Sequence, residues 1–315
     1  MAQLIKIQDY ITRYEWDTFR YPTQYIRLKR ESWDRLYERW SSPRRDMPSQ
    51  EELYSEETAD SIISKLKNKL LRKQVYSETV QEEQSSETEA LPETEQELKQ
   101  EFLDNLLNFQ MKWATSTVTH QSIVAKKYYS DSLLKYLLQR LPDTYLVMYH
   151  PIFSIRQVPV EGDIILISPV EIEVIQYVEL EEDAVLMASE ERTWHVESPK
   201  GNRKILNPLI SLKRTEKLVK SILATKDISL PVKRSVLSRT NPIYFASEPY
   251  QTQIIGSTNY IDWFNEKRSF QSPLKNVQIK AAQTLLRCCQ STSLKRSEWE
   301  KDGSGHATIE EAEDI

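Results

Sequence analysis

Hydrophobic residues recur with helical spacing in several parts of the chain. Trp33, Leu36, Tyr37 and Trp40 lie at i, i+3, i+4 and i+7, so they share one face of a helix. In another helix, the apolar residues from Ile123 to Leu141 are expected to face inward. The pattern predicts further helices over residues 59–71, 98–113, 122–140, 208–223, 259–268 and 273–290.

Alternating and short continuous apolar runs predict strands in the second half of the chain. The strands are expected over residues 145–149, 152–158, 163–167, 171–180, 184–189, 193–196 and 232–238, with an edge strand over 250–255. A helix, several strands, a helix and a strand, in that order, are typical of a restriction-endonuclease-like αβββαβ core. We therefore expect an α/β (α+β) fold with a mixed sheet, plus N-terminal and C-terminal helices.

Composition divides the chain into four regions. Residues 1–75 are rich in aromatic side chains and predict a helical region. Residues 76–97 contain eight glutamates and no lysine or arginine, which predicts a disordered acidic linker, because such a segment buries too little apolar surface to offset its chain entropy. Residues 98–300 predict a folded domain around a core at 120–240, and residues 301–315 an acidic disordered tail.

Several classes of protein are disfavoured by what the chain contains. The two cysteines, Cys288 and Cys289, are adjacent and lack the spacing of a zinc site or a disulfide framework. Five glycines form no phosphate-binding loop, so no nucleotide cofactor is expected. No stretch approaches the roughly 18 apolar residues of a membrane span, and the start has no signal-peptide pattern. We expect a cytoplasmic protein without a membrane partner.

The candidate chemistry lies between residues 161 and 197. A metal-dependent phosphodiesterase holds Mg²⁺ with carboxylates, because this ion prefers hard oxygen ligands. It also needs a cation to stabilise the charge that builds on the phosphate. Asp163 supplies one carboxylate before a strand, but the next strand offers Gln176 and Val178 where a second carboxylate and a lysine would stand.

Four short motifs carry a family resemblance: Glu161-Gly-Asp163, the strand Glu171 to Glu179, Thr193-Trp194 and Asn207-Pro208-Leu209. Together they make residues 143–223 resemble the nuclease-related (NERD) domain of bacterial proteins. This resemblance implies that Asp163, Gln176 and Val178 occupy the catalytic positions, where the family pattern has Asp followed by Glu-Val-Lys. It also implies a glutamate on the first core helix, and the chain has none between Phe102 and Val160. The expected outcome is a retained fold without phosphodiesterase activity or cofactor.

Charge is arranged in blocks along the chain. Residues 161–199 carry a net charge of −10 and residues 200–300 carry +11. Lys213, Lys217 and Lys220, with Arg214 beside them, fall on one face of the predicted helix at 208–223. Such a stripe would neutralise phosphates in nucleic acid, or it would pair with the protein's own acidic block.

Three functions follow from these observations. The leading hypothesis is an inactive nuclease-related module that binds nucleic acid or protein. The second is an active Mg²⁺-dependent nuclease with a site rearranged around Asp163, using Glu161 or Glu190. The third is an interaction scaffold that uses the N-terminal helices, whose aromatic face would otherwise dock on the protein's own core.

Overall fold

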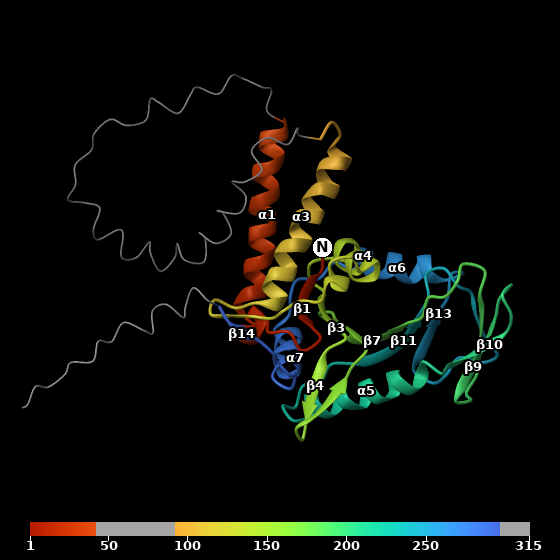
Figure 1. Cartoon of the computed structure of the whole chain (residues 1–315). Helices are drawn as coiled ribbons and strands as arrows, with labels where there is room; N and C mark the ends of the chain where they lie inside the picture. The colour runs from red at the N-terminus through yellow and green to blue at the C-terminus, as the bar shows by residue number, and fades with distance from the viewer. Residues whose placement is uncertain (42–91, 297–315) are drawn as a thin grey trace, which may run out of the picture. The chain divides into compact units, whose positions relative to one another are not determined.

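The computed structural model describes residues 1–41 and 92–296 (Figure 1). The described residues form two compact units. The first contains residues 1–29 together with the described residues from Leu103 onward, and the second contains those between Arg30 and Phe102. No helix in these ranges combines the length and the apolar character that crossing a bilayer requires.

A mixed sheet of six strands forms the centre of the first unit. In spatial order the strands are Gln3–Ile7 (β1), Leu146–Tyr149 (β3), Ile164–Ile167 (β6), Ile172–Tyr177 (β7), Val232–Leu237 (β11) and Thr252–Ile255 (β13). Strands β3, β6 and β7 are antiparallel neighbours, while β1 is parallel to β3, and β11 is parallel to both β7 and β13. The predicted mixed sheet is confirmed, and β13 lies at its edge as expected.

Six helices accompany the sheets in the described residues. They are Arg20–Ser41 (α1), Glu95–Thr115 (α3), Ser132–Arg140 (α4), Leu209–Ala224 (α5), Tyr260–Ser269 (α6) and Asn276–Leu286 (α7). Helices α5 and α6 lie on opposite sides of the six-stranded sheet (Figure 1). The helices predicted over 98–113, 208–223 and 259–268 are confirmed, that over 273–290 is shorter, and that over 59–71 lies outside the described residues.

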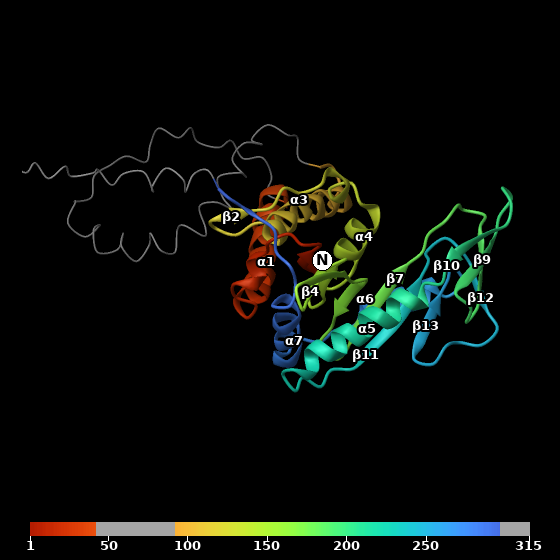
Figure 2. The ribbon, with the colours of Figure 1, turned by 60° about the horizontal axis from the view of Figure 1, so that its bottom comes forward.

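A second, four-stranded sheet stands at one end of the first unit (Figure 2). Its strands, in spatial order, are Arg203–Leu206 (β10), Thr193–Glu197 (β9), Val185–Ala188 (β8) and Ile243–Phe245 (β12). Its inner face packs around Trp194, which is fully buried in a cluster with Val174 and Leu212. The sequence pattern missed β10 and β12, because their residues are half-buried or exposed and show no apolar run.

The single strand predicted over residues 152–158 is wrong. The chain forms a hairpin there, Ile152–Ile155 (β4) and Val158–Glu161 (β5). Arg156 and Gln157 make the turn with φ of 50° and 67°, the left-handed region that two-residue hairpin turns require. Neither residue is glycine or asparagine, so the usual signal of such a turn is absent.

The helix predicted over residues 122–140 is also wrong in its first half. Helix α4 begins only at Ser132, where Asp131 caps it by accepting hydrogen bonds from the backbone N–H groups of Leu133 and Leu134. The preceding residues form a short strand, His120–Gln121 (β2), and a 3₁₀ turn, Lys126–Tyr128 (η3). Ile123 is 78% exposed and does not face inward.

Helix α3 begins inside the stretch predicted as an acidic linker. Thr94 and Glu97 form a reciprocal cap, in which the Thr94 N–H donates to Glu97 Oε2 and the Glu97 N–H donates to Thr94 Oγ1. This arrangement satisfies two backbone donors at the helix start, so glutamates that were expected to be disordered begin a helix. Residues 76–91 of the predicted linker lie outside the described residues.

The aromatic face of α1 is partly covered within the second unit. Trp33 meets the ring of Phe102 edge-on, with 5.2 Å between the centroids. Trp40 donates a hydrogen bond of 2.7 Å from Nε1 to the carbonyl of Pro92. Tyr37 lies between the two tryptophans and is more exposed than either. These side chains pack against neighbours in their own chain.

Strand β1 was not predicted, although every one of its residues is buried. It contains Gln3 and Lys6, which interrupt the apolar pattern. Its outer edge is closed by the side chain of Gln110 from α3: the Leu4 N–H donates to Gln110 Oε1, and Gln110 Nε2 donates to the carbonyl of Ala2, both at 2.6 Å. A side-chain amide thus occupies backbone groups that an edge strand would otherwise leave open.

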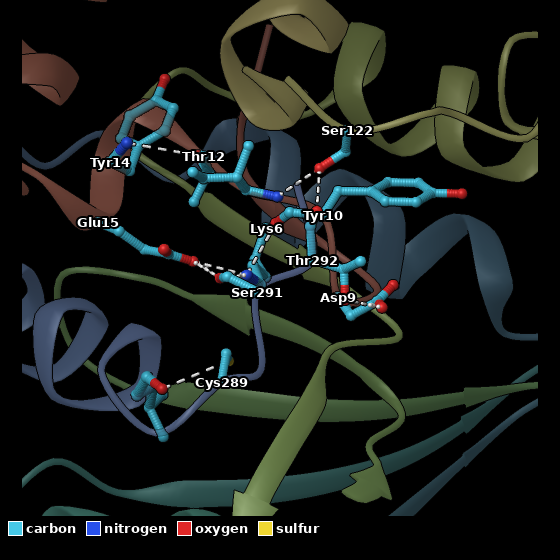
Figure 3. A network of polar contacts seen from close by, with 12 residues as sticks. Lys6, Asp9, Tyr10, Thr12, Tyr14, Glu15, Ser122, Cys289, Ser291 and Thr292 are labelled. Atoms are coloured by element: carbon cyan, nitrogen blue, oxygen red, sulfur yellow. Dashed lines mark hydrogen bonds and ion pairs between the residues drawn. The ribbon is translucent and has the colours of Figure 1, made fainter. Parts of the chain in front are cut away.

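A buried lysine joins β1 to the C-terminal segment of the described chain (Figure 3). Lys6 is 0% exposed, and its ammonium group contacts Glu15 at 2.6 Å and Ser291 Oγ at 2.8 Å. Next to Ser291, the Thr292 N–H donates to the carbonyl of Asp9 at 2.7 Å. Cys289 lies below this network in Figure 3, and burial raises the pKa of its thiol to about 12.

Candidate functional site

Asp163 lies directly before β6 and is 4% exposed. Thr215 of α5 holds it from two sides. The Thr215 hydroxyl donates to Asp163 Oδ2 at 2.7 Å, and the backbone N–H of Asp163 donates to Thr215 Oγ1 at 3.2 Å. The carboxylate therefore fastens the start of β6 to α5.

Gln176 lies near the end of β7 and faces the same helix. The Ser211 hydroxyl, one turn before Thr215, is 3.1 Å from Gln176 Oε1 and 3.0 Å from the carbonyl of Pro208. Ser211 also acts as a hydrogen-bond partner of Asp163. Of the three predicted catalytic positions, the structure thus brings Asp163 and Gln176 together at α5. Val178, just beyond β7, instead packs against the apolar cluster around Trp194.

The surroundings of Asp163 disfavour its charged form. Burial raises the pKa of Asp163 above its usual value of 3.8, and hydrogen bonds from Thr215 and Ser211 and the charge of Arg214 only partly oppose this effect. Protonation of Asp163 is therefore easier in the folded state than in the unfolded chain. The stability that protonated Asp163 contributes is present in full below pH 3.8. It is lost as the pH rises through the raised pKa of Asp163.

These residues do not fit a Mg²⁺ site. Asp163 is the only carboxylate of the set, it is buried, and one of its oxygens is taken by Thr215. Glu161 accepts a hydrogen bond from Gln8, and Glu190 is exposed in the turn between β8 and β9. No group of three His, Cys, Asp or Glu side chains within residues 1–41 and 92–296 could hold a metal ion.

We expect Asp163→Asn to leave the protein at least as stable as the wild type at pH 7. Asparagine keeps an oxygen that accepts the Thr215 hydrogen bond and removes a charge that burial disfavours. Thr215→Val should lose about 1–3 kcal/mol, because it removes the hydroxyl that donates to the buried carboxylate of Asp163 and accepts from its backbone N–H. Urea unfolding at pH 5 and pH 8 measures both. A loss above about 1 kcal/mol for Asp163→Asn at pH 8 would show that the charge itself stabilises the fold.

The outer face of α5 carries the predicted basic stripe. Lys213, Arg214, Lys217 and Lys220 are all exposed, whereas Thr215, Glu216 and Val219 between them are buried. Arg214 donates to the carbonyl of Glu161 at 3.1 Å, and Lys220 pairs with Glu216 at 2.7 Å. Lys213 and Lys217 form no ion pair with any acidic residue in the described ranges. The structure places the four residues together and leaves these two lysines exposed to solvent.

Other basic residues of the 200–300 block do pair with the acidic block. Lys267 contacts both Glu171 and Glu173, and Lys233 also contacts Glu171. Two more pairs join the blocks, Arg203 with Glu181 and Arg239 with Glu179. The two blocks therefore pair through residues outside the predicted stripe. Within the stripe, Lys220 pairs with Glu216 of its own helix, and Lys213 and Lys217 form no ion pair in the described ranges.

Sequence reasoning missed the hydroxyl pair on α5. Ser211 and Thr215 are spaced i, i+4 and so lie on one helix face. That spacing predicts a polar strip on α5, on the side of the helix opposite the basic residues. The Thr215 hydroxyl donates to Asp163, directly before β6, and the Ser211 hydroxyl donates to Gln176 on the neighbouring strand β7.

A second polar cluster, also missed, lies on the opposite side of the sheet. The Arg239 guanidinium lies 5.0 Å from the ring centroid of Tyr136 and 5.6 Å from that of Tyr177. It also pairs with Glu179. Burial alone would raise the pKa of Glu179, but hydrogen bonds from Tyr177 and Arg239 lower it below its usual value. The cluster is satisfied internally, which suits a structural role at the ends of β7 and β11.

Comparisons with known proteins place few limits on this site. No model of a known protein family matches the chain, and no solved structure matches it. An RNA 2′,3′-cyclic phosphodiesterase from Geobacillus stearothermophilus is 34% identical over 115 residues, which are 35% of this chain and 36% of that protein. The chain therefore spans about a third of the length of this relative.

Proposed function

We propose that this protein binds nucleic acid through α5, on a restriction-endonuclease-like core that has lost its metal-dependent catalytic site. The observation that carries the proposal is the pair Lys213 and Lys217, which stay exposed and without an acidic partner in the described residues while neighbouring cations are paired. Four helical residues span about 6 Å, so both ammonium groups can reach phosphates of one strand. Binding to phosphates releases counterions and gives affinity that depends on salt.

The order of elements supports the proposed core. Helix α4 is followed by the antiparallel strands β3, β6 and β7, then by α5 and the parallel strand β11. This is the αβββαβ order expected from the sequence, with the hairpin β4–β5 and the strands β8, β9 and β10 as insertions. We infer that the chain is a NERD-type protein in which Asp163, Gln176 and Val178 mark the former catalytic positions.

The character of those positions supports loss of hydrolysis. Asp163 and Gln176 are bound to hydroxyls of α5, and Val178 is part of an apolar cluster. The phosphodiester group itself remains the proposed ligand class, in keeping with the partial similarity to a protein named as an RNA phosphodiesterase. No observation favours the rearranged nuclease with Glu161 or Glu190 over this proposal.

The double substitution Lys213→Gln/Lys217→Gln should weaken nucleic-acid binding about ten-fold or more at low salt. It should also reduce the dependence of log affinity on log salt by about 2, roughly 1 for each lost phosphate contact. Fluorescence anisotropy with a labelled oligonucleotide, titrated at several salt concentrations without divalent ions, measures both quantities.

The matched control is Lys280→Gln/Lys295→Gln, which removes the same charge from exposed lysines on α7 and on the short strand Leu294–Lys295 (β14). It should leave the affinity and the salt slope near those of the wild type. If both double variants lose the same affinity, the effect comes from net charge alone, and the proposal is contradicted. Cleavage of the oligonucleotide with Mg²⁺ or Mn²⁺ that disappears in Asp163→Ala would contradict the proposed loss of activity.

A further inference from the structure

The outer face of the four-stranded sheet carries a row of exposed side chains in register. Tyr244 of β12 is paired with Met187 of β8, Met187 with His195 of β9, and His195 with Lys204 of β10. All four are exposed. Leu206 extends the face on β10 and is 62% exposed. Residues in register on neighbouring strands lie about 5 Å apart, so the row forms one continuous surface.

Core packing does not account for these side chains. Alternation along β9 buries Trp194 and Val196 on the inner face and leaves His195 outside. Tyr244, Met187 and Leu206 are large apolar side chains that lie on the water side of the sheet. No element in the described residues covers them, and Figures 1 and 2 both show this sheet at the end of the unit away from α7.

The face continues into the basic stripe of α5. Strand β10 ends at Leu206. Two residues separate it from α5, which exposes Ile210 before Lys213. Basic character lies on this side, with Lys204 in the row itself. Glu197 is paired with Val185 at the far end of the strands from Leu206. Glu190 and Glu191 are exposed in the turn between β8 and β9 near Leu206, but these three acids are outnumbered by Arg192, Lys204 and the four basic residues of α5. Charge therefore favours an anionic ligand that crosses from α5 over Leu206 and Lys204 toward Tyr244.

We infer that this face binds unpaired bases, so that the preferred ligand is single-stranded nucleic acid; this rests on the proposed nucleic-acid binding by α5. The ring of Tyr244 offers a stacking surface that any base can use, the aliphatic side chains beside it offer apolar contact, and nearby cations contact the backbone. The bases of a duplex are already stacked on each other, and their faces cannot reach the sheet. The lysines of α5 hold either form through phosphates, whereas the sheet face discriminates between them.

The test compares the full chain with the variant Tyr244→Ala/Leu206→Ser. The probes are labelled single strands of about 12 nucleotides, one of RNA and one of DNA, and a duplex of the same sequence. The variant should bind both single strands about five-fold more weakly or worse and bind the duplex as the wild type does. Tyr244→Phe, which keeps the ring, should retain the wild-type affinity.

The control Tyr250→Ala/Ile261→Ser removes a more exposed tyrosine and an exposed aliphatic side chain outside this face, and it should change nothing. If Lys213→Gln/Lys217→Gln weakens binding but Tyr244→Ala/Leu206→Ser does not, the role of α5 stands and the inference about the sheet is overturned. Equal losses for single strand and duplex also overturn it. So does a dimeric wild type that becomes monomeric in Tyr244→Ala/Leu206→Ser with unchanged affinity, because the face would then join two copies of the chain.

Discussion

Lys267→Met is expected to lower the free energy of unfolding by about 3–5 kcal/mol at pH 7, because it removes one partner from a buried ion cluster. Lys267 of α6 contacts Glu173 at 2.8 Å and Glu171 at 2.9 Å. Its side chain is 7% exposed and that of Glu173 is 3% exposed. Methionine fills a similar volume, so the loss reports on the uncompensated carboxylates rather than on a cavity.

The loss should shrink in acid. Burial alone would raise the pKa of Glu171, but hydrogen bonds and charge from Lys233 and Lys267 lower it below its usual value of 4.5. The stability that charged Glu171 contributes through its two lysine partners is therefore complete above pH 4.5. It is lost as the pH falls through the lowered pKa of Glu171. Without Lys267 the carboxylates gain less from being charged. Urea unfolding at pH 7 and pH 4 should show a smaller difference between variant and wild type at pH 4.

Two further variants make this result interpretable. Lys280→Met changes an exposed lysine of α7 and should cost little. Lys267→Met/Glu173→Gln removes both charges of the buried pair and keeps the oxygen that accepts the hydrogen bond from Trp263 Nε1, so it should recover part of the lost stability. A loss below about 1 kcal/mol for Lys267→Met would mean that water screens the cluster, contrary to its burial.

Asn241→Asp is expected to cost at least about 3 kcal/mol at pH 7, because a buried charge would face two carbonyl oxygens. Asn241 is 0% exposed, and its Nδ2 donates to the carbonyls of Glu181 and Ala184 at 2.7 and 3.0 Å. Its Oδ1 accepts from the backbone N–H of Leu180 at 2.7 Å. The amide thus joins the segment after β11 to the loop that leads into β8.

Asn202→Asp is the matched control, because it makes the same chemical change in the exposed turn between β9 and β10. It should unfold like the wild type. Hydrogen exchange of the Leu180 amide should accelerate in Asn241→Asp more than exchange in the six-stranded sheet does. Equal stability of the two variants would show that the Asn241 hydrogen bonds contribute little to the junction between the sheets.

Much of the six-stranded sheet follows from local patterns. Residues 164–167 are a continuous apolar run that forms β6. Residues 171–180 mix apolar side chains, most of them β-branched, with Glu173 and Gln176, and they contain β7. The patterns fail where a polar residue is buried or a turn lacks its usual residues. Strand β1 was missed because Gln3 and Lys6 are polar. Lys6 is satisfied by Glu15 nearby, and both side chains also have a partner more than 100 residues away. The turn between β4 and β5 was missed because Arg156 and Gln157 are not residues that usually form such turns.

The candidate site was predictable in position but not in chemistry. The parity of Asp163, Gln176 and Glu173 along their strands correctly separates the face toward α5 from the face toward α6. Ser211 and Thr215 were overlooked, because serine and threonine on a helix have no distinctive pattern and their role depends on which strands meet them. Whether a lysine is paired or exposed depends on distant neighbours too, which is why Lys267 and Lys217 look alike in the sequence and differ in the structure.

The link between Lys6 and Ser291 has a consequence for how the chain folds. These residues are 285 positions apart, and β1 joins a sheet whose adjacent strand begins at Leu146. Contacts between such distant parts of a chain close late and slow the folding of a domain. During synthesis, the first strand must wait for almost the whole described chain to leave the ribosome before its lysine gains this last partner. Docking of the segment around Ser291 should therefore be a late step in the folding of this unit.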